Sequence, residues 1–144
     1  IGLAGTMSLV MQNGNILHTI VYYACLPLRE LSLGLASVGM SAIISVINLL
    51  VPSASAKMAI LIPIIMPMAE SLGMSGNLAV SAFQFGDGFT NLVTPALGAT
   101  AGSLAIAGVP LSKWLKWALP ITLLMLVVSW IILYFLGSVG WTGV

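Results

Sequence analysis

Long apolar runs separated by short polar breaks make up most of this chain. The clearest run is 112–137, which has Lys113 and Lys116 at its start and Trp141 beyond its end. A membrane-spanning helix needs about 20 mainly apolar residues, so this run predicts a final transmembrane helix followed by a tail at 138–144. Lysines favour the cytoplasmic side of a membrane. We therefore expect the start of this helix inside and the tail outside.

The segment 32–72 contains two apolar runs of unequal length. The first covers 32–50, whereas the second, 58–69, is much shorter. As a helix the second run would reach about 18 Å, little more than half of a hydrocarbon core of about 30 Å. We therefore expect a re-entrant helical hairpin that enters and leaves on one face of the membrane, with its tip at 52–57. The alternative is a single kinked transmembrane helix over 32–69.

A third apolar stretch, 77–109, is long enough to span a membrane but is interrupted near its middle. Polar and helix-breaking residues gather at 86–95, which predicts a discontinuous transmembrane helix with an unwound centre. Residues 1–31 lie before the expected hairpin. They predict the end of a truncated transmembrane helix and then an amphipathic helix at the membrane interface. The expected fold class is an all-α integral membrane protein.

Composition supports this fold class and excludes others. Hydrophobic residues make up 60% of the 144 residues and charged residues only 5%, whereas a soluble domain has about 25% charged residues. The net charge of +1 comes without a basic run, so we expect no nucleic-acid partner. A single cysteine excludes a disulfide framework. The expected surroundings are the lipid bilayer.

The two breaks predict a binding site. Irregular backbone inside a membrane is tolerated only within protein or beside a water-filled cavity, and paired interruptions of apolar segments are typical of transporter sites. Ser53 or Ser55 can cap a helix that begins near Ala56, and Thr94 followed by Pro95 repeats this arrangement. Helix N-termini of this kind stabilise a carboxylate. We therefore expect an anionic substrate that carries a carboxylate.

Oxygen-bearing side chains in the breaks suit a small cation. The Asp87 carboxylate, the Asn91 amide and the hydroxyls of Ser53 and Ser55 are hard ligands, so we expect sodium at these four residues or, alternatively, a proton as the coupling ion. No other cofactor is expected. The substrate and ion site that the sequence predicts consists of Asn48, Ser53, Ser55, Lys57, Gln84, Asp87, Asn91 and Thr94.

Two charged residues in the breaks leave several interpretations open. For Asp87 we favour binding of a cation or proton; the alternatives are an ion pair with Lys57 and an Asp-Gly turn near the interface. Lys57 either holds a substrate carboxylate, supplies a tethered positive charge where another carrier binds sodium, or extends its ammonium group to the membrane surface. Gln84 precedes Asp87 by three residues and would complete a polar cluster on one helix face.

The breaks also resemble a known family. The segment 48–57, with the sequence NLLVPSASAK, continues into 61–64 and is followed at 82–95 by AFQFGDGFTNLVTP. These runs are similar to the C-terminal part of transporters of the YfcC/DcuC type, the C4-dicarboxylate anaerobic carrier-like proteins of the ion transporter superfamily. The resemblance covers nearly the whole chain and implies the second half of an inverted-repeat secondary transporter. It also implies that the substrate and ion site is lined by Ser53, Ser55, Asp87, Asn91 and Thr94.

The resemblance implies ion-coupled or exchange transport of small organic anions or amino acids, such as C4-dicarboxylates, by elevator-like alternating access in a bacterial inner membrane. The implied partners are the missing N-terminal repeat of the same carrier and a second copy in a homodimer. The alternatives are a structural subunit of a membrane complex and an intramembrane protease. No enzyme is expected, because the serine pattern at 73–76 has no histidine on a later helix and Asp87 is the only aspartate.

Overall fold

The computed structural model describes residues 26–51 and 53–143, together with Val10, Asn13, Gly14, Ile16, Thr19, Tyr22 and Tyr23. The helices expected within 1–31 lie largely outside these residues, and Pro52 of the expected hairpin tip lies outside them too. The elements are a short 3-10 helix η1 (Leu26–Glu30) and the α-helices α3 (Leu33–Leu50), α4 (Ala54–Ser71), α5 (Gly76–Thr90), α6 (Gly98–Ala107) and α7 (Leu111–Val139).

Regular secondary structure in the described part of the chain is entirely helical. Helices α3, α4 and α7 are each long and apolar enough to cross a membrane. Helix α7 matches the final transmembrane helix expected at 112–137 and extends slightly beyond it at both ends. The expectation of an all-helical membrane protein is therefore confirmed.

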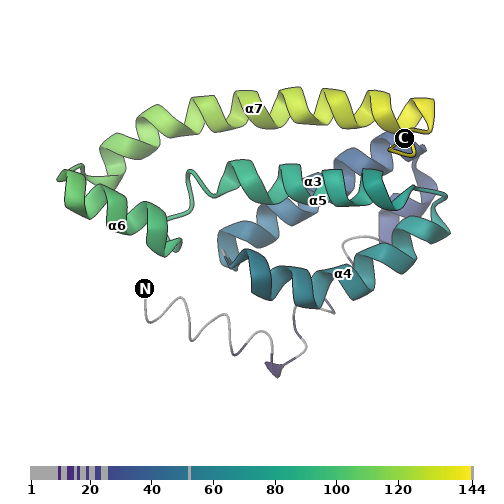
Figure 1. Ribbon diagram of the computed structural model, residues 1–144, viewed down its shortest axis with the longest axis horizontal. Coiled ribbons are helices and arrows are strands. Elements are labelled where there is room, and N and C mark those ends of the chain that lie inside the picture. The colour runs from purple at the N-terminus through teal and green to yellow at the C-terminus, as the bar shows by residue number, and fades with distance from the viewer. Residues whose placement is uncertain are drawn as a thin grey trace.

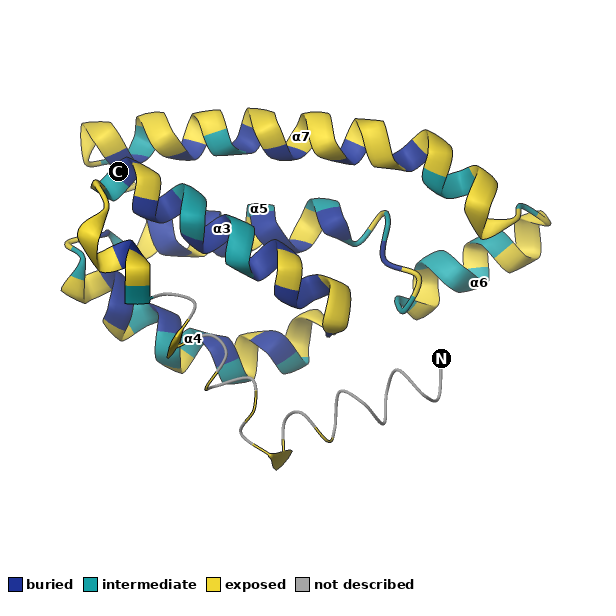
Figure 2. Ribbon diagram, turned by 180° about the vertical axis from the view of Figure 1, so that it is seen from behind, coloured by how far each residue is buried: buried dark blue, intermediate teal, exposed yellow. Residues whose placement is uncertain are grey.

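Helix α5 lies at the centre of the bundle and packs on α3, α7 and α4. Helix α7 runs along one side and also packs on α3, whereas α4 lies on the opposite side and packs mainly on α5 (Figure 1). Helix α6 lies beyond the ends of α3 and α5 (Figure 1). Figure 2 shows α7 exposed along most of its outer face, as suits a helix that faces lipid or another protein segment.

Small residues bring α3 and α7 close together near one end of the bundle. A Cβ atom on Gly137 would lie 2.7 Å from Gly34 Cα, so neither position has room for a side chain. One helical turn away, Ser37 Oγ donates a hydrogen bond of 3.1 Å to the carbonyl oxygen of Leu133. Close packing of small residues and hydrogen bonds between helices are the main sources of helix association in lipid.

The residues after α7 fold back onto the start of α5 at this same end. Ser75 caps α5, because its hydroxyl accepts a hydrogen bond from Leu78 N at 3.2 Å and donates one to Trp141 O at 2.7 Å. Asn77 Nδ2 donates to Thr142 O at 2.7 Å. The start of α5 and the end of α7 therefore share one end of the bundle.

Helix α4 differs from the short second arm that the sequence predicts at 58–69. It has 18 residues, as many as α3, and continues through Pro63 and Pro67. Each helix therefore reaches about 27 Å, and the expected half-length arm is wrong. Because α4 runs back toward the end of the bundle at which α3 begins (Figure 1), the alternative of one kinked helix over 32–69 is wrong as well.

The interruption between α5 and α6 lies later than expected. Helix α5 continues to Thr90, so the non-helical segment is 91–97 rather than 86–95. Glycine in a helix costs about 1 kcal/mol relative to alanine, which favoured a break at Gly86 and Gly88. At Gly86 the absence of a side chain instead allows α5 to pack closely on α3, and this tertiary packing outweighs the weak propensity.

Thr94 does not cap α6. The residue at the N-cap position is Leu97, which provides no side-chain capping hydrogen bond. The Thr94 hydroxyl instead donates to the carbonyl oxygen of Thr90 at 2.9 Å. The expected second half-helix with Pro95 in its first turn is therefore wrong, because Thr94 satisfies the end of α5 rather than the start of α6.

Candidate functional site

A buried polar cluster lies where α3 and α5 end and α4 begins. Asn48 comes from the last turn of α3, Lys57 from the first turn of α4, and Asp87 and Thr90 from the last turn of α5. These four residues are buried, and Asn91, which follows α5, is half-buried beside them. We call these five residues the polar cluster.

Lys57 and Asp87 form an ion pair at the centre of the polar cluster. Lys57 Nζ donates to Asp87 Oδ1 and also to Asn48 Oδ1. The Lys57 side chain is 0% exposed and that of Asp87 is 6% exposed. A buried charge without a partner is strongly destabilising. The pair and the amide oxygen therefore allow both groups to stay charged within the bundle.

The structure decides between some of the interpretations that the sequence left open. Asp87 pairs with Lys57, which was not the favoured interpretation. An Asp-Gly turn is wrong, because α5 is helical through Asp87 and Gly88. Lys57 does not extend to the surface, since its side chain is fully buried. Binding of a cation or proton by Asp87 stays a prediction.

Asn48 connects the three helices through one amide group. Its Nδ2 atom donates to Asp87 O at 2.9 Å, Thr90 Oγ1 at 2.7 Å and Asn91 Oδ1 at 2.8 Å, while its Oδ1 atom accepts from Lys57. The last four carbonyl groups of a helix have no intrahelical partner. Asn48 provides one for Asp87 O, which fixes the end of α5 against α3.

The ends of the three helices also favour the observed charges. The C-terminal ends of α3 and α5 carry partial negative charge, which stabilises the nearby Lys57 ammonium group. Helix α4 begins here with partial positive charge. Ser53 occupies its N-cap position, but the hydroxyl makes no capping hydrogen bond, so backbone N–H groups in the first turn are left without a side-chain acceptor.

The expected site residues separate into two groups. The polar cluster contains Asn48, Lys57, Asp87 and Asn91, and Thr94 is buried and joined to it through Thr90. The side chains of the other three are exposed, and none of them makes a hydrogen bond to the cluster among those found in the described residues. These three are Ser53, Ser55 and Gln84.

The sodium set expected at four residues is divided in the same way. Asp87 and Asn91 belong to the polar cluster, whereas Ser53 and Ser55 lie on the exposed start of α4. Among the residues that the structure describes, no group of three or more His, Cys, Asp or Glu side chains is placed to hold a metal ion. Sodium at this site stays a prediction.

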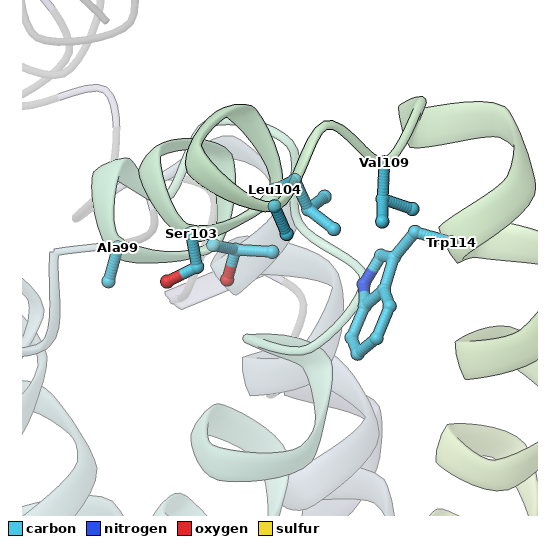
Figure 3. A pocket seen from close by; sticks show the side chains of 7 residues that line it. Ala99, Ser103, Leu104, Val109 and Trp114 are labelled. Atoms are coloured by element: carbon cyan, nitrogen blue, oxygen red, sulfur yellow. The ribbon is translucent and has the colours of Figure 1, made fainter.

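Of two hollows near the end of α5, one adjoins the cluster. A groove of about 430 Å³ between α3, the end of α5 and α7 is lined mainly by apolar side chains and reaches Thr90. A second hollow, of about 410 Å³, lies between α6 and the start of α7, where Ser103 and Trp114 lie on facing sides (Figure 3).

Two hydrogen bonds hold the non-helical segment between α5 and α6. Trp114 Nε1 donates to Leu92 O at 2.9 Å, and Thr100 Oγ1 donates to Asn91 O at 3.2 Å.

The sequence profile of the C4-dicarboxylate anaerobic carriers, DcuC, matches residues 1–137 of the chain. The chain belongs to this family. YfcC of Escherichia coli (strain K12), named provisionally as a basic amino acid antiporter, is 29% identical over 121 residues, which are 81% of this chain and 24% of YfcC. An uncharacterized protein of Haemophilus influenzae is 28% identical over 133 residues, 92% of this chain and 26% of that protein. No solved structure matches the chain.

Membership of the DcuC family and the three apolar helices indicate a membrane protein. The chain spans about a quarter of the length of the curated relatives it matches. The polar cluster therefore belongs to one part of a longer DcuC-family protein.

Thr90 is the cluster residue that sequence reasoning missed. Its hydroxyl accepts from Asn48 and donates to Gly86 O at 2.8 Å. The signal was its spacing, because a residue three positions after Asp87 shares a helix face with it. The sequence interpretation placed both residues in an unwound segment, where this spacing has no meaning.

Proposed function

We propose that this chain is part of a secondary active transporter for small organic anions or amino acids, such as C4-dicarboxylates, that works by ion coupling or exchange in a bacterial inner membrane. The observation that carries the proposal is the buried Lys57–Asp87 pair with Asn48, at the meeting point of three helix ends in a DcuC-family chain. Ionisable groups inside membrane segments are costly and by default mark substrate or ion pathways.

The substrate carboxylate binds at the start of α4. Ser53 and Ser55 are exposed there, and the first-turn N–H groups have no side-chain cap, an arrangement that suits an anion. Lys57 lies in the same turn, and its ammonium group is paired with Asp87. Dicarboxylates and amino acids both carry a carboxylate, so this site suits either substrate class.

Helix lengths support a re-entrant hairpin within an inverted-repeat carrier. Helices α3 and α7 approach each other at Gly34 and Gly137 near one end of the bundle. From there α3 extends about 27 Å and the 29 residues of α7 about 43 Å. Measured from this contact, the α3–α4 connection therefore does not reach as far as the start of α7. Elevator-like movement would carry this connection across the membrane relative to a scaffold.

The remaining partners are proposed from the family and from α7. The N-terminal repeat of the same carrier would cover part of its exposed face, and a second copy would complete a homodimer. Thr122 Oγ1 and Trp130 Nε1 are buried and lack hydrogen-bond partners among the described residues. Both residues line the groove between α3 and α7, and polypeptide can satisfy such groups whereas lipid tails cannot.

The test is uptake by the full-length carrier in proteoliposomes, with C4-dicarboxylates and basic amino acids supplied separately and with sodium and proton gradients imposed one at a time. We expect Asp87→Asn and Ser55→Ala each to lower uptake tenfold or more, equivalent to about 1.4 kcal/mol of binding. Glu70→Gln and Ser138→Ala change an exposed carboxylate and an exposed serine far from the cluster and serve as controls. Unchanged uptake in both site variants would refute the site.

A further inference from the structure

The two atoms that contact the Lys57 ammonium group are oxygens of the kind that a small hard cation takes as ligands. Lys57 Nζ contacts Asp87 Oδ1 and Asn48 Oδ1. Within one hydrogen bond of Asn48 lie a backbone carbonyl, a hydroxyl and a second amide oxygen, from Asp87, Thr90 and Asn91. Carboxylate, carbonyl and hydroxyl oxygens are the ligands of sodium-like and calcium-like ions. The negative ends of α3 and α5 converge on the same place.

The oxygen atoms and the positive charge come from different elements. Asn48 belongs to α3, and Asp87, Thr90 and Asn91 belong to α5 or follow it, whereas Lys57 is supplied by α4. Helices α3 and α5 pack extensively on each other, whereas α4 contacts mainly α5. The α3–α5 pair therefore supplies the two oxygen atoms that contact the ammonium group, and α4 supplies the cation.

Charge balance leaves no place for a second cation beside Asp87. Its carboxylate is paired one to one with Lys57. The other two acidic residues of the chain, Glu30 and Glu70, are exposed, so neither adds negative charge to the polar cluster. A sodium ion bound there would leave an uncompensated buried positive charge, which is strongly destabilising.

We propose that the Lys57 ammonium group takes the place of a coupling sodium ion, so that the carrier works without sodium and removal of the amine creates a sodium site. This inference rests on the proposed transport function and specifies its coupling. It also accounts for the division of the sodium set expected from the sequence, since Asp87 and Asn91 face the cluster while Ser53 and Ser55 remain at the exposed start of α4.

Thermal unfolding of the purified full-length carrier tests this inference without a known substrate. Sodium chloride is compared with choline chloride at equal ionic strength. We expect the same melting temperature in both salts for the wild type and a sodium-specific, saturable rise of several degrees for Lys57→Ala, because a ligand that binds only the folded state stabilises it. Methylammonium should stabilise Lys57→Ala in the same way, since it restores the missing group.

Two variants serve as controls. Lys116→Ala removes an exposed lysine at the start of α7 and should show no sodium effect. Lys57→Ala combined with Asp87→Asn should lose the sodium effect, because it removes the charged ligand. A folded Lys57→Ala protein that responds to neither cation would overturn the inference.

Wild-type measurements keep the inference testable even where Lys57→Ala fails to fold. Sodium-driven uptake by the wild type, or a sodium-specific rise in its melting temperature, would overturn the inference while the transport function stands. Wild-type uptake that is the same in sodium and choline supports it. A sodium effect in Lys57→Ala without any uptake by the wild type would support the cation site and refute the transport function.

Discussion

The contact with the largest consequence at the scale of single residues is the Lys57–Asp87 pair. Removing two charges from water costs several kcal/mol for each ion, and their attraction offsets this only when further hydrogen bonds complete the geometry. Asn48 supplies such a bond, since its amide oxygen accepts from Lys57 and its amide nitrogen fixes the end of α5. The pair is therefore balanced as a unit, and neither member is stable alone.

Replacing one member of this pair should destabilise the carrier much more than replacing both. We expect Lys57→Met or Asp87→Leu alone to lower the free energy of unfolding by about 3–5 kcal/mol, because each leaves the other charge buried and unpaired. The double variant should recover most of this loss but remain inactive in uptake. Melting temperatures of the purified full-length proteins check this order, and Glu70→Gln is the exposed control. Single variants as stable as the wild type would contradict it.

The sequence identified the members of the polar cluster better than their contacts. Lys57 and Asp87 were conspicuous because they are charged residues between apolar runs. Asn48 was conspicuous because it precedes the first break, and Asn91 because it lies within the second. The pairing of Lys57 with Asp87 was only an alternative interpretation, since it depends on the directions of three helices, which the sequence does not give. Ser53 and Ser55 looked equivalent to the other polar residues in sequence, yet the start of α4 leaves both exposed.

At the scale of elements, the close approach of α3 and α5 depends on Gly86. A Cβ atom at this position would lie 2.5 Å from Ser41 O and 3.0 Å from Ile44 Cβ. The first of these atoms belongs to the backbone of α3, so it cannot move aside cheaply. By contrast, the nearest heavy atom to a Cβ at Gly88 is the flexible end of Gln84, at 3.9 Å.

These two glycines, two residues apart in α5, should respond oppositely to alanine. Gly86→Ala should lower the free energy of unfolding by about 1–3 kcal/mol, because it forces α5 away from α3. Gly88→Ala should leave it unchanged or raise it by up to about 1 kcal/mol, since alanine favours the helix and meets no neighbour. Thermal unfolding of both full-length variants measures the difference. Equal effects would show that α3 and α5 do not meet at Gly86.

Helices with a continuous apolar pattern were predicted closely, and the broken one was not. The boundaries of α3 and α7 lie within a few residues of those expected, because long apolar runs in a membrane protein have little alternative to a helix. The end of α5 was misplaced because local propensity treats Gly86 and Gly88 as helix breakers, whereas packing against α3 requires a small residue at Gly86.

At the scale of the whole molecule, the two ends of the bundle are chemically different. One end joins the starts of α3 and α5 to the end of α7 through Gly34–Gly137 packing and the Ser75–Trp141 hydrogen bond. Toward the other end lie the polar cluster, the segment after α5 and helix α6. Because α3, α4 and α5 are all much shorter than α7, their helix ends meet part-way along it, which is the position that the proposed transport function requires of a substrate site.

Single cysteines in a full-length carrier without other cysteines test this arrangement in the membrane. Ser71→Cys and Thr142→Cys should react with a membrane-impermeant maleimide from one side, because α4 ends and the chain after α7 folds back at the same end of the bundle. Lys116→Cys should react from the opposite side.

The depth of the α3–α4 connection is tested by spin labels. A label at Ser53 should be less accessible to a water-soluble relaxation agent than one at Lys116, because the α3–α4 connection does not reach the level of the start of α7. Equal accessibility from the Lys116 side would mean that α3 and α4 cross the membrane completely, and the re-entrant hairpin would be wrong.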